Sequence, residues 1–203
     1  MKNILNTPKK GILMVTLFAT MLSFASKTSA FKIENNTENT SLVLDVKAGN
    51  LLIIKDFKGV ILYEESMKQS GLYTKSFDLT ELPDGDYIFE LDKDLEIQTI
   101  PFEVVENTVT FKTDMETTIF KPATRVKGEI VFVSRLSLNK EPMEISIYFT
   151  DNRSTFSNSE LIYSETVTDT DNLSRVYKLE ARYNGSYTMV YKTGGRIFTS
   201  QVN

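Results

Sequence analysis

Hydrophobic and polar residues alternate along most of the chain in short runs, the pattern of half-buried β-strands. In residues 86–92, the side chains of Tyr87, Phe89 and Leu91 fall on one face, and the polar residues and Ile88 on the other. Pro-Asp-Gly, Gln-Ser-Gly and similar turn residues separate the runs, and this spacing is typical of a sandwich or barrel. The predicted strands are 41–47, 50–57, 60–66, 72–79, 86–92, 96–105, 128–138, 144–151, 160–167, 175–181, 186–192 and 196–202.

The second half of the chain repeats the first half, in register and without a gap, when residues 61–100 are compared with residues 161–200. Average composition would give about two or three identities in such a window. Seven are present: Tyr63/Tyr163, Glu65/Glu165, Leu79/Leu179, Gly85/Gly185, Tyr87/Tyr187, Ile97/Ile197 and Thr99/Thr199. The sequence therefore predicts an all-β fold of two tandem immunoglobulin-like antiparallel β-sandwich domains.

The boundary between the repeats is predicted between Val109 and Lys127, where the alternation is unclear and a Lys-Pro pair occurs. We therefore divide the chain into a signal peptide at 1–30, a first β-sandwich repeat at 31–112 and a second at 113–203.

The N-terminal thirty residues have the three parts of an export signal: early lysines, an apolar stretch at 11–25 and a small-residue cleavage site ending at Ala30. We expect the mature chain to begin at Phe31. The alternative, an uncleaved membrane anchor, would need about twenty apolar residues. Loss of the four lysines of the signal changes the net charge from −4 to −8.

Composition excludes several kinds of chemistry. The chain has no His and no Cys, which removes the commonest general base, the usual nucleophile pairs and disulfide bonds. We expect no enzyme activity and no cofactor. An acidic mature chain without a basic cluster is a poor ligand for nucleic acid, and no later stretch is long and apolar enough to span a membrane. The expected partner is a protein or glycan, met in the periplasm, at the cell surface or outside the cell.

Paired acidic residues are the remaining candidates for chemistry. Asp84-Gly85-Asp86 and Asp92-Lys93-Asp94 are interpreted as turns, because Asp and Gly build hairpin connections. Asp169 and Asp171 form the best residual candidate for a metal site, although they lack the longer ligand series of a calcium loop. A carboxylate pair in a small glycan-active enzyme stays open as a distant alternative.

The second repeat carries an insertion after Asp151, which is either a binding loop or a tolerated surface insertion. Together with the unpaired edge strands of a sandwich, it leads us to expect binding mainly in residues 120–203, with the first repeat as a spacer. The candidate loop residues are Asn152, Arg153, Phe156 and Asn158, and the aromatic residues near that end are Tyr183, Tyr191 and Phe198. The alternative is that these aromatic residues are core, which the alternation favours for Tyr191.

The segment Leu82-Pro83-Asp84-Gly85-Asp86-Tyr87 resembles the turn before strand F of fibronectin type III and related sandwiches. That resemblance implies structural roles for Tyr87, Tyr187, Gly85 and Gly185, with each Tyr hydroxyl bonded to the backbone across a corner.

The wider segment 51–87 resembles the C-terminal sorting domain of type IX secretion cargo, in which a strand ending in Asp is followed by a Gly turn, a second strand, a Leu-rich stretch and Gly-x-Tyr. The second copy keeps Asn184-Gly185-Ser186-Tyr187 and ends in Gly195-Arg196-Ile197-Phe198. Our leading interpretation is an exported, non-catalytic binding or adhesion module at the cell surface. The resemblance implies the alternative, a cargo-like protein with a sorting signal in its C-terminal domain.

Overall fold

The computed structural model describes residues 31–35, 39–151, 159–168, 170–180 and 185–202. These residues form strands and one short 3-10 helix. The first unit contains β1 (Lys32–Asn35), β2 (Thr40–Val46), β3 (Leu51–Asp56), β4 (Ile61–Ser66), β5 (Gly71–Phe77), β6 (Gly85–Asp92), β7 (Glu96–Val105), β8 (Thr108–Phe111), η1 (Thr113–Met115) and β9 (Thr117–Phe120). The second unit contains β10 (Ala123–Lys127), β11 (Ile130–Leu136), β12 (Met143–Asp151), β13 (Ser159–Val167), β14 (Asn172–Lys178), β15 (Gly185–Thr193) and β16 (Arg196–Val202).

Both units are built from two antiparallel sheets with the same strand order. In the first unit β1-β2-β5 faces β4-β3-β6-β7-β8, and in the second β10-β11-β14 faces β13-β12-β15-β16. The shift in pairing register between Ile54 and Lys55 of β3 recurs in β12 between Ile147 and Tyr148. The predicted all-β sandwich fold is confirmed, and strands β1 to β7 correspond to β10 to β16.

Each pair of sheets encloses its own apolar core. In β6 the side chains of Tyr87, Phe89 and Leu91 point inward, as the alternation predicts. The Phe89 ring lies at the centre of the first core, with its centroid 5.2 Å from that of Phe102 and 5.9 Å from that of Phe111. Aromatic residues bury large areas, so a core of this kind stabilises the sandwich without disulfide bonds.

The segment between the repeats is more structured than the sequence indicates. It contains β8, η1, β9 and β10. Strand β9, which the division at 112/113 assigns to the second repeat, pairs with β7 of the first unit. A four-residue strand shows only two residues on each face, so its alternation is too short to detect. The next residues, Lys121 and Pro122, lead directly into the second unit.

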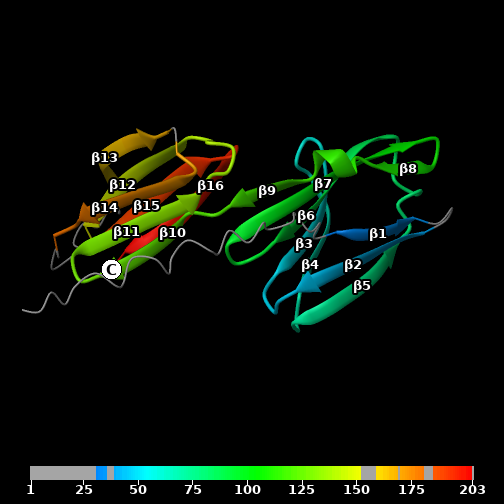
Figure 1. The fold of residues 1–203 in the computed structure, drawn as a ribbon, viewed down its shortest axis with the longest axis horizontal. Coiled ribbons are helices and arrows are strands. Elements are labelled where there is room, and N and C mark those ends of the chain that lie inside the picture. The colour runs from blue at the N-terminus through cyan, green and yellow to red at the C-terminus, as the bar shows by residue number, and fades with distance from the viewer. Residues whose placement is uncertain (1–30, 36–38, 152–158, 169, 181–184, 203) are drawn as a thin grey trace, which may run out of the picture.

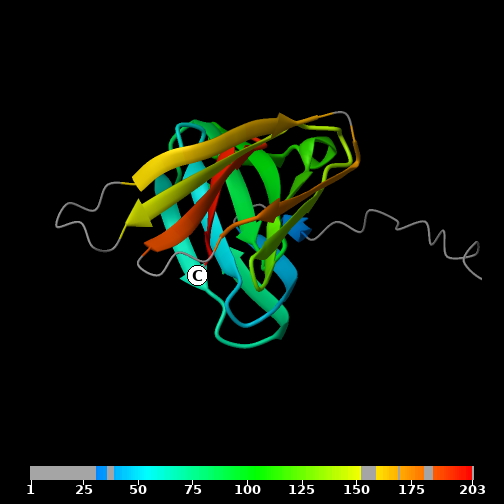
Figure 2. The ribbon, with the colours of Figure 1, turned by 90° about the vertical axis from the view of Figure 1, so that its left-hand side faces the viewer.

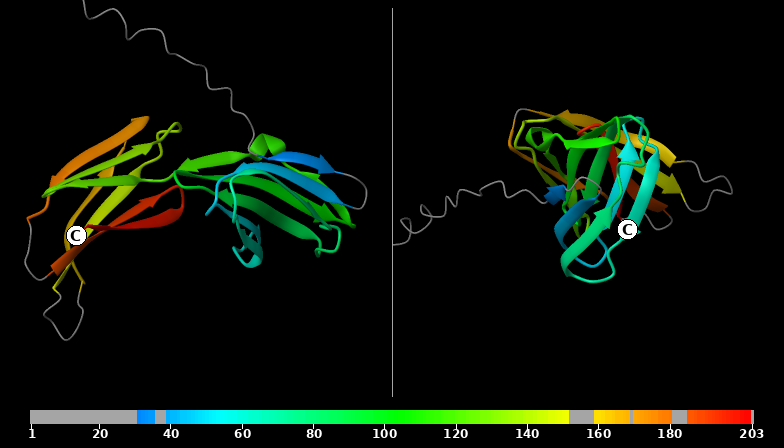
Figure 3. Two further views of the ribbon diagram at one scale, coloured as in Figure 1. Left: turned by 90° about the horizontal axis from the view of Figure 1, so that it is seen from below. Right: turned by 90° about the vertical axis from the view of Figure 1, so that its right-hand side faces the viewer.

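The two units follow one another along the long axis of the molecule and are joined at β9 (Figures 1 and 3). In the view along this axis they lie one behind the other (Figure 2). The connection is supported by side chains. The Arg135 side chain, 3% exposed in the second unit, donates from Nε to the carbonyl oxygen of Phe120 over 3.0 Å. The β15–β16 turn also reaches the first unit, where a Cβ on Gly194 would lie 3.2 Å from the Ile119 side chain.

An ion cluster around the buried Glu90 side chain forms the second link between the units. Arg196 at the start of β16 donates two hydrogen bonds to Glu90 of β6, over 2.9 and 2.5 Å, and Lys55 donates a third over 2.5 Å. We call these three residues the Glu90 clamp. The sequence places Glu90 on the solvent side of β6, yet it is only 3% exposed, because the second unit covers this part of the sheet.

The predicted signal peptide at 1–30 lies outside the described residues, so it stays a prediction. Phe31, the expected first residue of the mature chain, is 5% exposed and belongs to the first core. Among the described residues, no helix has the length and apolar character needed to cross a membrane.

Candidate functional site

The outer face of the sheet β10-β11-β14 gathers cations and exposed apolar side chains. Strand register puts Arg125 opposite Phe132 and Phe132 opposite Val176, and the row beside it contains Lys127 and Lys178. Val131 and Val133, the neighbours of Phe132 along β11, are buried in the core, so Phe132 points outward. We call Arg125, Lys127, Phe132, Val176 and Lys178 the basic face.

The apolar members of the basic face are open to solvent. Phe132 is 41% and Val176 is 59% exposed. A shallow hollow of about 420 Å³ beside Phe132 is lined by residues of β10 and β11, including Arg125 and Lys127. Within the part of the chain that the structure describes, Arg125 and Lys127 have no ion-pair or hydrogen-bond partner for their side chains, whereas Lys178 lies 3.6 Å from a carboxylate oxygen of Glu129.

Among the described residues of the first unit, the corresponding row carries different side chains. Its strand register aligns Glu34 of β1 with Ser41 of β2 and Ser76 of β5. Phe77 of β5 and Tyr177 of β14 occupy the same place in the two units, so the residues before them, Ser76 and Val176, also correspond. The strand partners of these two residues then match Ser41 with Phe132 and Glu34 with Arg125. An acidic and polar row in one repeat is thus a cationic and apolar row in the other, so the two faces have different binding chemistry.

The repeated residues Tyr63 and Glu65 belong to a polar cluster that closes the open side of the first sandwich. Glu65 accepts hydrogen bonds from Lys75 over 2.8 Å, from Tyr63 and from Tyr73 over 2.7 Å. These hydrogen bonds, the one from Lys75 first, lower the pKa of Glu65 to about 2. The cluster joins β4 of one sheet to β5 of the other, so its first role is structural.

The second unit repeats this arrangement with Arg175 in place of Lys75. Glu165 accepts from the Tyr177 hydroxyl over 2.6 Å and from Arg175 Nε over 2.9 Å. Burial by itself raises the pKa of Glu165, but these two hydrogen bonds outweigh it and hold the pKa below its usual value. Two of the seven identities, Tyr63/Tyr163 and Glu65/Glu165, therefore belong to this link between the sheets. The alternation of polar and apolar residues does not reveal the link.

Among the strands that the structure describes, β4 pairs with β3 and β13 pairs with β12, each on one side, so both are edge strands. Their exposed apolar side chains are Val60, Ile61 and Leu62 in and just before β4, and Leu161, Ile162 and Tyr163 in β13. Open edges of this kind are templates for an added strand. They match the sequence-based expectation of unpaired edges.

The predicted corner tyrosines both contact the backbone. The Tyr87 hydroxyl donates to the carbonyl oxygen of Pro83 over 2.6 Å, and the Tyr187 hydroxyl donates to that of Glu180 over 3.0 Å. Gly185 packs tightly, since a Cβ there would lie 2.8 Å from the Thr150 carbonyl oxygen. At Gly85 the nearest atom would be 3.7 Å away. The stability that these residues provide stays a prediction.

The other sequence-based candidates are not brought together. The candidate loop residues Asn152, Arg153, Phe156 and Asn158 lie outside the described residues, as do Asp169 and Tyr183. Asp171 is exposed, and its carbonyl oxygen accepts from the Ser137 amide. No group of three or more acidic side chains that could hold a metal ion occurs in the described parts of the chain. Tyr191 is 1% exposed and belongs to the second core, as the alternation in its strand indicated, and the partly buried Phe198 packs against that core.

Comparisons with known proteins leave the function open. No family model matches the chain, and no curated protein matches it. The resemblance to type IX sorting domains therefore stays a prediction. Among solved structures, the chain is similar to one described as "Biofilm associated protein - BSP domain", at 14% identity and a TM-score of 0.27. The match covers 85% of this chain and 29% of that chain, so this chain spans less than a third of its length.

Proposed function

We propose that this is an exported, non-catalytic binding protein of the cell surface, in which the basic face of the second unit attaches to an anionic surface polymer. The observation that carries the proposal is the contrast between the two units. Arg125, Phe132 and Val176 stand where the first unit has Glu34, Ser41 and Ser76.

The physical reasons are charge and exposure. Arg125 and Lys127 have no charged or hydrogen-bonding partner in the described chain, so their attraction for an anion is not already satisfied. Phe132 adds apolar contact area next to them. The face is shallow, which suits an extended polymer better than a small molecule that needs an enclosed pocket.

The proposal agrees with the sequence-based expectation that binding resides in residues 120–203. It differs in the element that carries the binding. The expectation rested on the 152–158 loop and the C-terminal aromatic residues, whereas the proposed surface lies on β10, β11 and β14. It also differs from the expectation of no basic cluster, because Arg125 and Lys127 of β10 meet Lys178 of β14 only through strand register.

The test is a double substitution that converts the basic face to its first-unit counterpart, Arg125→Glu with Phe132→Ser. The control, Lys32→Glu with Leu72→Ser, makes the same change of charge and removes an exposed apolar side chain in the first unit. The parent and the two double variants are each added to cells of the producing organism that do not make this protein themselves. The fraction of added protein that the cells retain is measured from about 0.05 M to about 0.5 M NaCl.

We expect the parent and the control to be retained at low salt and released as salt rises, and the Arg125→Glu, Phe132→Ser variant to be lost at every salt concentration. Equal retention of the two double variants would overturn the proposal. Retention that does not change with salt would overturn the anionic nature of the partner.

A further inference from the structure

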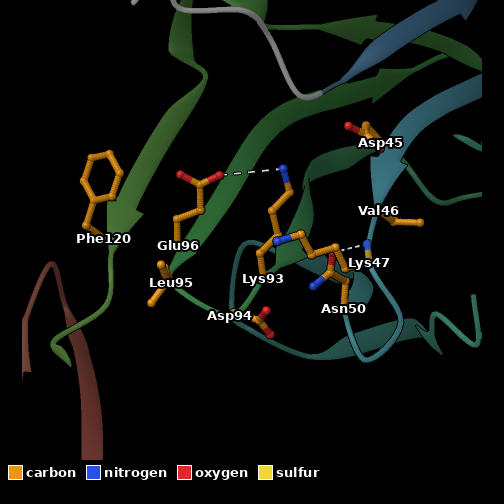
Figure 4. Close-up of a pocket in the computed structure, with 9 residues that line it drawn as sticks. All are labelled: Asp45, Val46, Lys47, Asn50, Lys93, Asp94, Leu95, Glu96 and Phe120. Atoms are coloured by element: carbon orange, nitrogen blue, oxygen red, sulfur yellow. Dashed lines mark hydrogen bonds and ion pairs between the residues drawn. The ribbon is translucent and has the colours of Figure 1, made fainter. Parts of the chain in front are cut away.

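An open cleft of about 650 Å³ lies at the end of the first unit where the chain passes to the second unit (Figure 4). Three segments form its walls: the end of β2 and the following turn with Asp45 and Asn50, the β6–β7 turn with Asp94 and Leu95, and Phe120 at the end of β9. It is separate from the basic face, so an inference about it does not depend on the proposed function.

Local hydrogen bonds hold the two turns in shape. In the β2–β3 turn, the Asn50 amide donates to the Lys47 carbonyl oxygen over 3.0 Å, and the Lys47 amide donates to Asn50 Oδ1 over 2.8 Å. In the β6–β7 turn, the Lys93 amide donates to the Glu96 carbonyl oxygen over 2.9 Å. Walls fixed in this way lose little conformational freedom when a ligand binds.

The aromatic wall is held by both units. The residue after Phe120, Lys121, donates its amide to the Leu95 carbonyl oxygen over 2.8 Å. From the second unit, Arg135 donates to the Phe120 carbonyl oxygen. Phe120 and Leu95 thereby lie next to each other on one side of the cleft, as Figure 4 shows. Leu95 is 68% exposed although it is a large apolar residue.

The amide nitrogen of Asn50 is an unsatisfied donor. Asn50 is 2% exposed, its Oδ1 is used within the turn, and its Nδ2 has no hydrogen-bond partner. In Figure 4 the Nδ2 atom lies on the side that faces Lys93 and Asp94. Buried donors normally have an acceptor. An acceptor supplied from the cleft, by a ligand or by a water that a ligand holds, would satisfy this donor.

The charged groups of the cleft are mixed in sign. Asp45 and Asp94 are exposed carboxylates without a partner in the described chain, and Lys93 lies 3.6 Å from Glu96. Such a lining does not select an ion by charge. It offers acceptors and donors together, which is what hydroxyl groups require, since each hydroxyl both donates and accepts.

We propose that this cleft binds a neutral oligosaccharide. The apolar face of one sugar ring lies on Leu95 and Phe120, and its hydroxyl groups donate to the carboxylates of Asp94 and Asp45. A sugar oxygen, or a water bound to it, accepts from Asn50 Nδ2. A site that holds hydroxyl groups by hydrogen bonds discriminates against ligands that lack them.

The test is titration of the exported protein with cellohexaose, maltohexaose and mannohexaose, followed by ¹H–¹⁵N NMR. The side-chain amide signals of Asn50 and the backbone amide of Leu95 are the readout. The variants are Asp94→Ala and Leu95→Ala, which remove one polar and one apolar contact of the cleft. The controls, Glu64→Ala and Leu72→Ala, remove an exposed acid and an exposed leucine outside it.

We expect at least one hexasaccharide to give saturable shifts of both signals, and each cleft variant to weaken binding about tenfold, or about 1.4 kcal/mol, while the controls bind as the parent does. The proposal is overturned if none of the three sugars shifts the Asn50 side-chain signals. It is also overturned if binding survives both cleft variants, or if a basic peptide shifts the same signals while the sugars do not.

Discussion

Removal of Arg196 from the Glu90 clamp is the most direct test of how the two units are held together. Arg196→Ala leaves Glu90, which is 3% exposed, with Lys55 as its remaining cationic partner. Two charged hydrogen bonds, of 2.9 and 2.5 Å, are lost. Loss of one partner of a buried ion pair is costly, and the remaining Lys55 reduces that cost to about 1–3 kcal/mol of unfolding free energy.

The matched control lies on the adjacent strand of the same sheet. Lys192 is 3.0 Å from a carboxylate oxygen of Glu144, but the two side chains are 53% and 40% exposed. Exposed pairs contribute about 0–1 kcal/mol, so Lys192→Ala should change stability little. Urea unfolding measures both values. A double-mutant cycle of Glu90→Gln and Arg196→Ala isolates the coupling between the two side chains, for which we expect at least about 1 kcal/mol.

The clamp also predicts a change in the arrangement of the units. Small-angle X-ray scattering of the Arg196→Ala variant should show a broader distribution of interatomic distances than the parent or Lys192→Ala. The reasoning is refuted if the Arg196→Ala and Lys192→Ala variants lose the same stability and scatter like the parent. Such a result would mean that β9 and Arg135 alone fix the orientation of the second unit.

Three further predictions concern single side chains. Gly185→Ala should cost about 1–3 kcal/mol, because its Cβ would lie 2.8 Å from a backbone oxygen, whereas Gly85→Ala, with 3.7 Å to the nearest atom, should stay within about 0.5 kcal/mol. Tyr87→Phe should cost about 1 kcal/mol through loss of the 2.6 Å bond to Pro83. The folded-state pKa of Glu65, about 2, lies below its ordinary value of 4.5. The contribution of Glu65 to the stability of the folded protein is therefore complete above pH 4.5 and is lost as the pH falls towards 2. Glu65→Gln should flatten this part of the dependence of stability on pH.

Urea unfolding midpoints check these predictions. Equal losses for the two glycine variants would contradict the packing argument at Gly185. An unchanged midpoint for Tyr87→Phe would show that the corner hydrogen bond adds no stability. An acid profile of Glu65→Gln that follows the parent between pH 4.5 and 2 would contradict the assignment of that range to Glu65.

The sequence by itself determined which residues form strands and which faces are buried. The side-chain period of a strand is two, so Tyr87, Phe89 and Leu91 could be placed inside from their own neighbours. Because the sequence repeats, the same reasoning placed Tyr187 and Met189 inside the second sandwich, and both belong to the second core. The signal is local, and it failed at β8, β9 and β10, whose four or five residues are too few to show a clear period.

Tertiary structure alone decided what lies across strands and between units. Arg125, Phe132 and Val176 form one row only because the register of β10, β11 and β14 aligns them. Glu90 is buried only because Arg196, a residue 106 positions away, reaches the outer side of its sheet. Register and contacts between units depend on partners distant in the chain, and alternation along one strand holds no information about them. The basic face, the cleft and the clamp could therefore be found only in the folded molecule.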